Sequence, residues 1–95
     1  MHKYEITVVF KPAFDDEALA AELEKVQDLI RRFGGTVEKV DSWGKRRLAY
    51  EIQKVGEGFY YFLTVDAEPG FPRALEDRLR ITESVLRYLI IRLDK

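Results

Sequence analysis

The sequence predicts an α+β fold in which a four-stranded antiparallel sheet carries two helices on one face. Four stretches have the alternating apolar pattern or the aromatic and β-branched composition of strands. Two further stretches have apolar residues every three or four positions, which is typical of helices. The order along the chain is strand, helix, strand, strand, helix, strand. The chain of 95 residues is short enough for one domain, so we expect residues 1–95 to form a single folding unit.

The first strand is expected from Tyr4 to Phe10, where every second residue is apolar or aromatic and so lies on one face. Pro12 ends this strand because proline has no backbone N–H to donate. A helix is then predicted from Asp15, which is a suitable N-cap residue, to the glycines at 34 and 35, which favour a left-handed stop. Its apolar stripe consists of Leu19, Leu23, Val26, Ile30 and Phe33.

A long second strand is predicted from Thr36 to Ile52, with a bulge at Gly44 because the alternation is interrupted there. The segment Lys54 to Gly58 is predicted to be a turn, since it contains two glycines. Phe59 to Asp66 is apolar on both faces, which is typical of a central strand.

The second helix begins near Pro72, a residue suited to a first helical turn, and buries Phe71, Leu75 and Leu79 on one side. Val85 to Leu93 is the last expected strand. This βαββαβ order is that of ferredoxin-like folds. Right-handed crossovers place both helices on one face, make the first and third strands central, and leave the other face uncovered.

The composition argues against an enzyme. Cysteine is absent and the only histidine is His2, so thiolate chemistry and an internal histidine base are both excluded. The acidic pairs lie at helix positions where capping and solvation account for them, and no phosphate-binding loop or metal-ligand spacing occurs. We therefore expect no catalytic residue, no cofactor and no metal site. With no secretory signal and no apolar run long enough for a membrane span, a cytoplasmic location is expected.

The stretch WGKRRLAYE, residues 43–51, holds three consecutive cations although the formal net charge of the chain is −1. Lys45, Arg46 and Arg47 fall on an edge strand, where cations can prevent edge-to-edge aggregation. They can equally bind phosphates, since arginine and lysine make most contacts to nucleic-acid backbones. Trp43 has two interpretations as well: core packing, which its residue type favours, or an exposed platform for a partner.

Several motifs together carry a resemblance to one family over nearly the whole chain. They are YEI at 4–6, GGTVEKVDSWGKRRLAYEI from Gly34, the Gly58-Phe59-Tyr60 strand start, and LRITESVLRYLIIRLDK at 79–95. In these features the chain resembles ribosomal protein six of the bacterial small subunit. The resemblance implies a structural protein of the small ribosomal subunit that binds the central domain of 16S ribosomal RNA together with small-subunit protein eighteen.

The resemblance also implies two sets of site residues. The expected RNA-binding residues are Lys3, Lys45, Arg46, Arg47, Lys54, Arg80 and Arg87. The expected partner-binding residues are Trp43, Tyr50, Tyr60 and Phe62.

Two other functions remain open on the sequence. The aromatic run from Phe59 to Phe62 is a poor match to the third strand of an RNA-recognition motif, which would bind single strands by stacking. A ferredoxin-like ligand-sensing or regulatory module is the other alternative.

Overall fold

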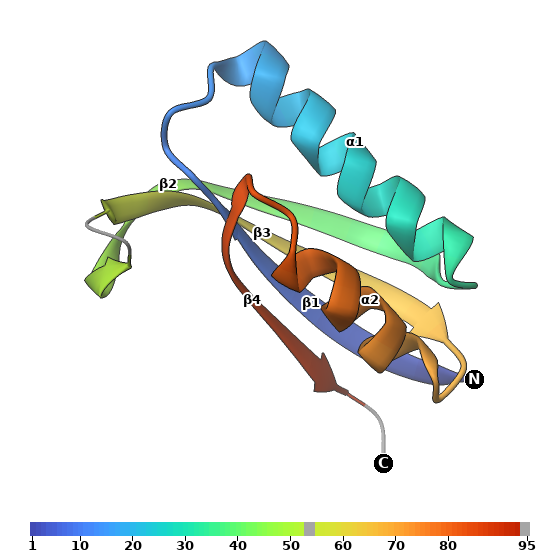
Figure 1. The fold of residues 1–95 in the computed structure, drawn as a ribbon. Coiled ribbons are helices and arrows are strands. Elements are labelled where there is room, and N and C mark those ends of the chain that lie inside the picture. Colours follow the sequence, from blue (N-terminus) through green and yellow to red (C-terminus); the bar gives the residue numbers. More distant parts are fainter. Residues whose placement is uncertain (53–54, 94–95) are drawn as a thin grey trace.

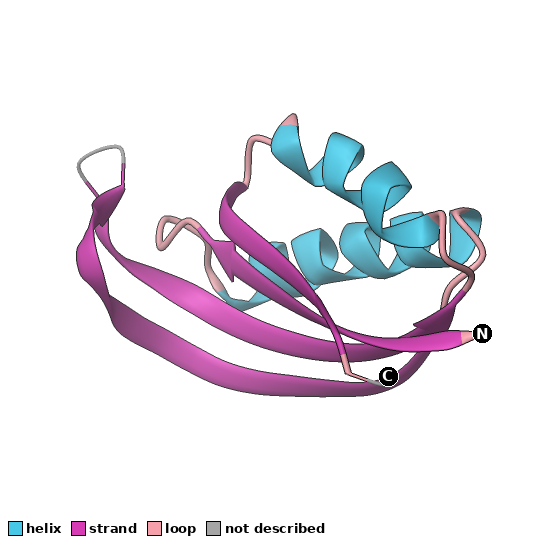
Figure 2. Cartoon of the chain, turned by 90° about the horizontal axis from the view of Figure 1, so that it is seen from below, coloured by secondary structure: helices cyan, strands magenta, loops and turns pink. Residues whose placement is uncertain are grey.

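The computed structural model describes residues 1–52 and 55–93 of the chain. In chain order the elements are β1 (His2–Phe10), α1 (Asp16–Arg32), β2 (Thr36–Ile52), β3 (Val55–Ala67), α2 (Phe71–Arg80) and β4 (Val85–Arg92). Both helices lie on the same side of one sheet, as Figures 1 and 2 show. No helix in the described residues is both long enough and apolar enough to cross a membrane.

The strand order is β2-β3-β1-β4, and every neighbouring pair is antiparallel. The predicted ferredoxin-like βαββαβ topology is therefore confirmed, with β1 and β3 in the centre and β2 and β4 at the edges. The side of the sheet away from the helices is called the open face below.

The core lies between the sheet and the helices. The residues that α1 buries are Leu19, Val26 and Ile30, and those that α2 buries are Phe71, Leu75 and Leu79. They pack on the alternating residues of β1 and β3, among them Ile6, Val8, Phe10, Leu63 and Val65. Burying each large apolar side chain stabilises the fold by roughly 1.5–3 kcal/mol, so this layer fixes the sheet on which the site is built.

The two ends of α1 follow the sequence signals. The Asp15 side chain accepts a 2.8 Å hydrogen bond from the Ala18 N–H, which makes it the N-cap. Gly34 has a φ of +87°, the left-handed conformation that a helix stop requires and that glycine adopts without a steric penalty.

The β2–β3 hairpin is longer than the rest of the sheet. Pairing between β1 and β3 ends at Phe10 and Phe59, whereas β2 and β3 continue together past this point. The residues 45–52 and 55–59 form a projecting arm, which Figure 2 shows extending beyond the helices. The predicted bulge is present, because Gly44 has a φ of +73° and the β2–β3 register shifts between Ser42 and Gly44.

The predicted turn from Lys54 to Gly58 is wrong for most of its length, because β3 already begins at Val55. Gly58 is a buried strand residue paired with Arg46, and a Cβ on it would lie 2.4 Å from Val9 Cγ1. The glycine therefore allows close packing within the sheet, not a change of chain direction. Lys54 lies outside the described residues.

Candidate nucleic-acid and partner interface

The three consecutive cations lie on the arm and divide between its two faces. Lys45 pairs with Phe59, whose ring packs against the core, and its Nζ lies 5.5 Å from the Phe59 ring centroid. Arg47 follows on the same face, whereas Arg46 pairs with Gly58 and lies on the open face. All three side chains are exposed.

No carboxylate in residues 1–52 and 55–93 lies within 4.0 Å of a nitrogen of Lys45, Arg46 or Arg47. Other cations of the chain are paired within the same range. The Arg31 guanidinium lies 2.7 Å from Asp28, for example, and Lys25 Nζ lies 2.9 Å from Glu22. Residues 45–47 are thus a local concentration of positive charge on a chain of formal net charge −1, although the arm also carries the exposed carboxylates Glu51 and Glu57.

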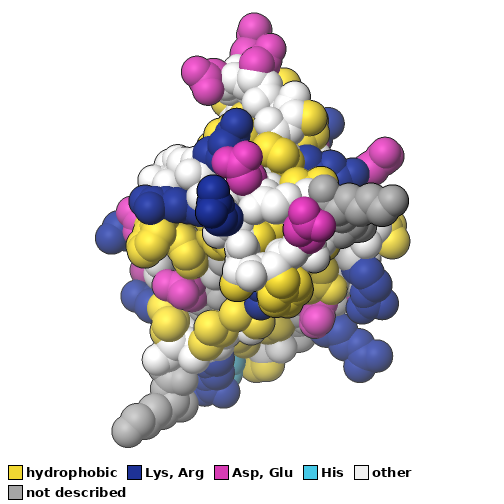
Figure 3. All heavy atoms as spheres, turned by 90° about the vertical axis from the view of Figure 1, so that its left-hand side faces the viewer, with side chains coloured by type: hydrophobic (Ala, Val, Ile, Leu, Met, Phe, Trp, Pro, Cys, Tyr) yellow, Lys and Arg dark blue, Asp and Glu magenta, His cyan; other side chains and the backbone are white. Residues whose placement is uncertain are grey.

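The charge is distributed unevenly over the surface. The first turn of α1 carries Asp16 and Glu17 beside the N-cap Asp15. Figure 3 views the end from which the arm projects, with a group of carboxylates at the top and further carboxylates among the lysine and arginine side chains below it.

Trp43 lies on the open face, and 54% of its surface is exposed. Its ring centroid is 4.9 Å from that of Phe62, at an angle of 60° between the ring planes. The core-packing interpretation of Trp43 is therefore wrong. The bulge at Gly44 supplies the reason, because Trp43 is the extra residue between the two positions that pair with β3 and is directed onto the open face.

An apolar band crosses the open face from β2 to β4. Tyr60 and Phe62 lie side by side on β3, with ring centroids 6.5 Å apart. Leu89 and Ile91 of β4 are 48% and 44% exposed and pair with Thr7 and Glu5 of β1. We call Trp43, Tyr60, Phe62, Leu89 and Ile91 the apolar band.

Three other predicted RNA-binding residues, Lys3, Arg80 and Arg87, do not join the arm. Lys3 lies at the opposite end of the open face, and its Nζ is 3.0 Å from the Glu38 carboxylate. This hydrogen bond lowers the pKa of Glu38. The β3 partners of Arg46 and Lys3 are Gly58 and Asp66, which are separated by about 26 Å along the strand.

Arg80 is at the end of α2 and is already engaged. Its guanidinium donates a 2.9 Å hydrogen bond to Asp77, and a hydrogen bond with Tyr88 followed by the Asp77 charge raises the pKa of Arg80. Arg87 is exposed on the open face in the same row as Val9 and Tyr60, next to the apolar band. Tyr50, a predicted partner-binding residue, is 64% exposed on the arm and apart from the band.

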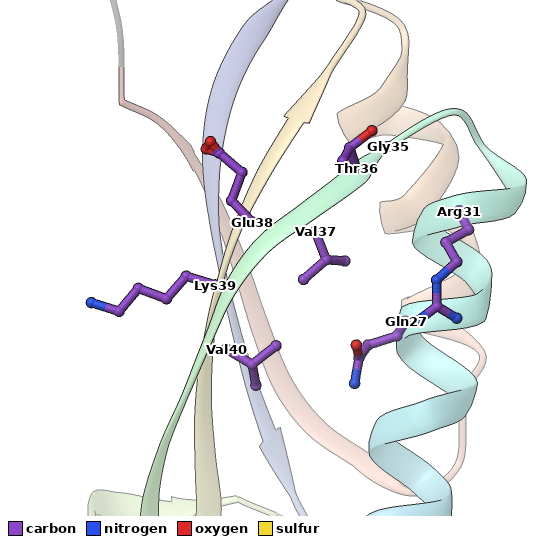
Figure 4. A pocket seen from close by; sticks show the side chains of 8 residues that line it. All are labelled: Gln27, Arg31, Gly35, Thr36, Val37, Glu38, Lys39 and Val40. Atoms are coloured by element: carbon purple, nitrogen blue, oxygen red, sulfur yellow. The ribbon is translucent and has the colours of Figure 1, made fainter.

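A cleft of about 450 Å³ lies elsewhere, between α1 and the first half of β2. Figure 4 shows Val37 and Val40 directed toward the helix, with Glu38 and Lys39 directed away from it. Two cations line this cleft: Arg31 is held by Glu24 and Asp28 at 3.3 and 2.7 Å, and Lys39 Nζ lies 3.5 Å from the Asp41 carboxylate. The cleft therefore offers little free charge to a ligand. The described residues also contain no group of three or more acidic or histidine side chains that could hold a metal ion.

Comparisons with known proteins agree with this architecture. The model of the family Ribosomal protein S6 matches residues 3–92. The chain belongs to the ribosomal protein S6 family. A small ribosomal subunit protein bS6 from Clostridium beijerinckii is 50% identical over 91 residues, which are 96% of each chain. A bS6 protein from Clostridium kluyveri is 44% identical over the full length of both chains.

A solved S6 structure supports the fold as well. The crystal structure of the small-subunit ribosomal protein S6 from Thermotoga maritima superposes with a TM-score of 0.90 at 28% identity, covering 97% of this chain and 87% of the other. Membership of the S6 family makes this chain a structural ribosomal protein and not an enzyme.

Sequence reasoning missed two residues of the apolar band, Leu89 and Ile91. Arg87, Leu89 and Ile91 are alternate residues of the edge strand β4, and they pair with Val9, Thr7 and Glu5, the open-face residues of β1. The signal was the period-two pattern at 87, 89 and 91, which places these side chains opposite to the ones packed on the helices.

Proposed function

We propose that this chain is a constituent of the bacterial small ribosomal subunit that binds the central domain of 16S ribosomal RNA together with small-subunit protein eighteen. The observation that carries the proposal is the cluster of Lys45, Arg46 and Arg47, which has no carboxylate partner in the described residues and lies on a projecting arm. Family membership supports the ribosomal setting.

The arm suits a phosphate backbone for three reasons. It projects past the helices, so a helical RNA can approach without meeting the body of the domain. Its cations lie on both faces of a paired hairpin, so they can contact more than one phosphate. Phosphate contacts by arginine and lysine supply most of the sequence-independent affinity of nucleic-acid binding. Lys45, Arg46 and Arg47 are the proposed RNA contacts on the arm. Arg87 is a further proposed RNA contact on the adjoining open face.

The apolar band suits a protein partner. Exposed aromatic and aliphatic residues that gather on one face and adjoin charged residues are typical of protein interfaces. Trp43 is the largest of them, and tryptophan contributes strongly when an interface buries it. We assign Trp43, Tyr60 and Phe62 to protein eighteen, and this pairing leaves the arm accessible to RNA.

Single-strand binding by stacking is the weaker alternative. Base stacking needs an open aromatic ring face. Trp43 lies across Phe62 at 60°, which covers part of that ring. The Phe59-to-Phe62 run also places Phe59 on the helix side, where it packs against the core.

The proposal is tested by measuring affinity for a central-domain 16S RNA fragment with and without protein eighteen over a salt series. We expect tight binding that depends on the partner and weakens with salt, with a log–log slope of about −0.9 for each phosphate neutralised on duplex. Tight binding to short unstructured RNA without the partner would favour the stacking alternative. If the chain shows no binding even with the partner present, it has kept the family fold without this function.

A further inference from the structure

A cavity of about 260 Å³ opens on the open face where β1, β3 and β4 run side by side. Its lining includes Thr7, Val9, Tyr60, Phe62, Arg87 and Leu89. Pockets for small molecules measure roughly 300–1,000 Å³ and enclose most of the ligand. This smaller, open hollow fits one side chain of a partner better than a cofactor.

The floor of the cavity is apolar and fixed. Val9 is 1% exposed, although it lies on the face of β1 that the helices do not cover. It is held below the surface because its neighbour Gly58 has no side chain and leaves room for the Val9 methyl group. The aromatic side chains of Tyr60 and Phe62 form the wall on the β3 side. A hollow with this lining gains free energy by taking up an apolar group.

One cation stands at the rim. Arg87 is exposed, and no carboxylate in the described part of the chain lies within ion-pair distance of it. Its neighbours in the row across β1 and β3 are Val9 and Tyr60, so its surroundings are apolar and aromatic. A guanidinium in such surroundings pairs well with a planar carboxylate, which it can bind through two hydrogen bonds.

We propose that this cavity is the socket for one apolar anchor side chain of the protein partner, and that Arg87 pairs with a carboxylate beside that anchor. The inference rests on the proposed function, because the proposed function assigns the open face to protein eighteen. It moves Arg87 from the RNA contacts to the protein interface. It also makes the occupant specific: a segment that presents an aliphatic or aromatic residue next to an aspartate or glutamate.

RNA is a less suitable occupant of the socket. The exposed rim residue Leu89 is aliphatic, and it offers a base neither a stacking ring nor a hydrogen bond. Phosphates that approached Arg87 would bring a strongly hydrated backbone over this aliphatic surface. A folded protein segment can cover the same surface and exclude water from it.

The test uses the full chain and purified protein eighteen, with titration calorimetry in the absence of RNA. Thr7→Leu fills the socket, and Thr64→Leu makes the same change on the open face outside the cavity lining. Arg87→Glu reverses the rim charge, and Arg73→Glu makes the same charge change on α2. We expect Thr7→Leu and Arg87→Glu to weaken binding at least tenfold, about 1.4 kcal/mol, and both controls to bind within about twofold of wild type.

Thermal unfolding of every variant shows whether it is folded. Leu89→Ser serves as a second socket variant because Leu89 is exposed at the rim. If Thr7→Leu, Leu89→Ser and Arg87→Glu all bind protein eighteen with the affinity of wild type, the socket is overturned and the proposed function stands. The socket would also be overturned if these variants spared protein binding and weakened RNA uptake by the preformed heterodimer, or if they abolished only self-association of the chain. No binding of wild type to protein eighteen, with or without RNA, would overturn the proposed function itself.

Discussion

The side chain of Arg46 folds back over Trp43. Its Nε donates a 3.0 Å hydrogen bond to the Trp43 carbonyl oxygen, and its guanidinium carbon lies 5.6 Å from the centroid of the Trp43 ring. A cation above an aromatic face at this distance is stabilised by about 0.5–1 kcal/mol at an exposed site. The middle cation of the arm therefore connects the proposed RNA-binding cluster to the proposed protein-binding band.

Replacing both arginines of the arm tests whether Arg46 and Arg47 stabilise the fold or bind RNA. We expect Arg46→Ala with Arg47→Ala to leave the unfolding temperature nearly unchanged, because both side chains are exposed and the contacts of Arg46 are on the surface. Assembly with RNA and protein eighteen should weaken, and the salt slope should become shallower by about 0.7–0.9 for each phosphate that the variant no longer neutralises. The measurements are thermal unfolding and a salt titration of RNA binding.

The control for this double variant is Arg73→Ala, which removes an exposed cation from α2. It should leave the salt slope as in wild type. A double variant that unfolds at a much lower temperature would show that the cations of the arm are structural.

Gly58 is expected to tolerate no side chain, whereas Gly56 two residues earlier in β3 should accept one. A Cβ at Gly58 would lie 2.4 Å from Val9 Cγ1 and 3.1 Å from the Phe10 carbonyl oxygen, and one at Gly56 would meet nothing within 4 Å. We expect Gly58→Ala to lower the free energy of unfolding by about 1–3 kcal/mol, which is typical of overpacking. Gly56→Ala should change it by less than about 0.5 kcal/mol. Urea denaturation of both variants checks this, and equal stabilities would contradict the packing role of Gly58.

Gly44 and Gly58 show where the sequence was informative and where it was not. Regular periodicity predicted both helices and the helix-facing core, because burial of an apolar face imposes the period, and right-handed crossovers then predicted the strand order. A glycine, however, signals a turn, a bulge or a close approach equally well. Gly44 was predicted as a bulge and is one, whereas Gly58 was predicted as part of a turn and lies in a strand.

The candidate site was only partly predictable for the same reason. The three cations are consecutive in the sequence, so their cluster was visible without a structure. The apolar band joins residues of β2, β3 and β4, and only the strand register brings Trp43, Phe62 and Leu89 to the same face. The engagement of Lys3 by Glu38 is likewise a consequence of register, since the two residues are far apart in the sequence.

The left-handed conformation of Gly44 should be needed to direct Trp43 onto the open face. Gly44→Ala places a side chain at a φ of +73°, which costs about 1–2 kcal/mol for an L-residue. We expect lower stability in urea and a changed emission maximum of Trp43, which is the only tryptophan of the chain. Gly70→Ala is the matched control, because Gly70 has a φ of −78° and open space around it. An unchanged emission maximum in Gly44→Ala would mean that the bulge does not determine the position of Trp43.

Glu22 should make the fold sensitive to acid. The hydrogen bond with Lys25, whose Nζ lies 2.9 Å from Glu22 Oε2, is the main cause that lowers the pKa of Glu22, and the Glu22 side chain is only 15% exposed. A carboxyl whose pKa is lower in the folded state stabilises the fold above the unfolded-state pKa, and this contribution disappears as the pH falls through the folded-state pKa. Glu22→Gln should therefore reduce stability at neutral pH and flatten the decline in stability in the acid range below the ordinary glutamate pKa. Urea denaturation over a pH series measures both effects. Glu24→Gln makes the same charge change at an exposed position of α1, and its stability should decline with falling pH as steeply as that of wild type. If the stability of Glu22→Gln also declined as steeply as that of wild type, Glu22 would not be a source of the acid sensitivity.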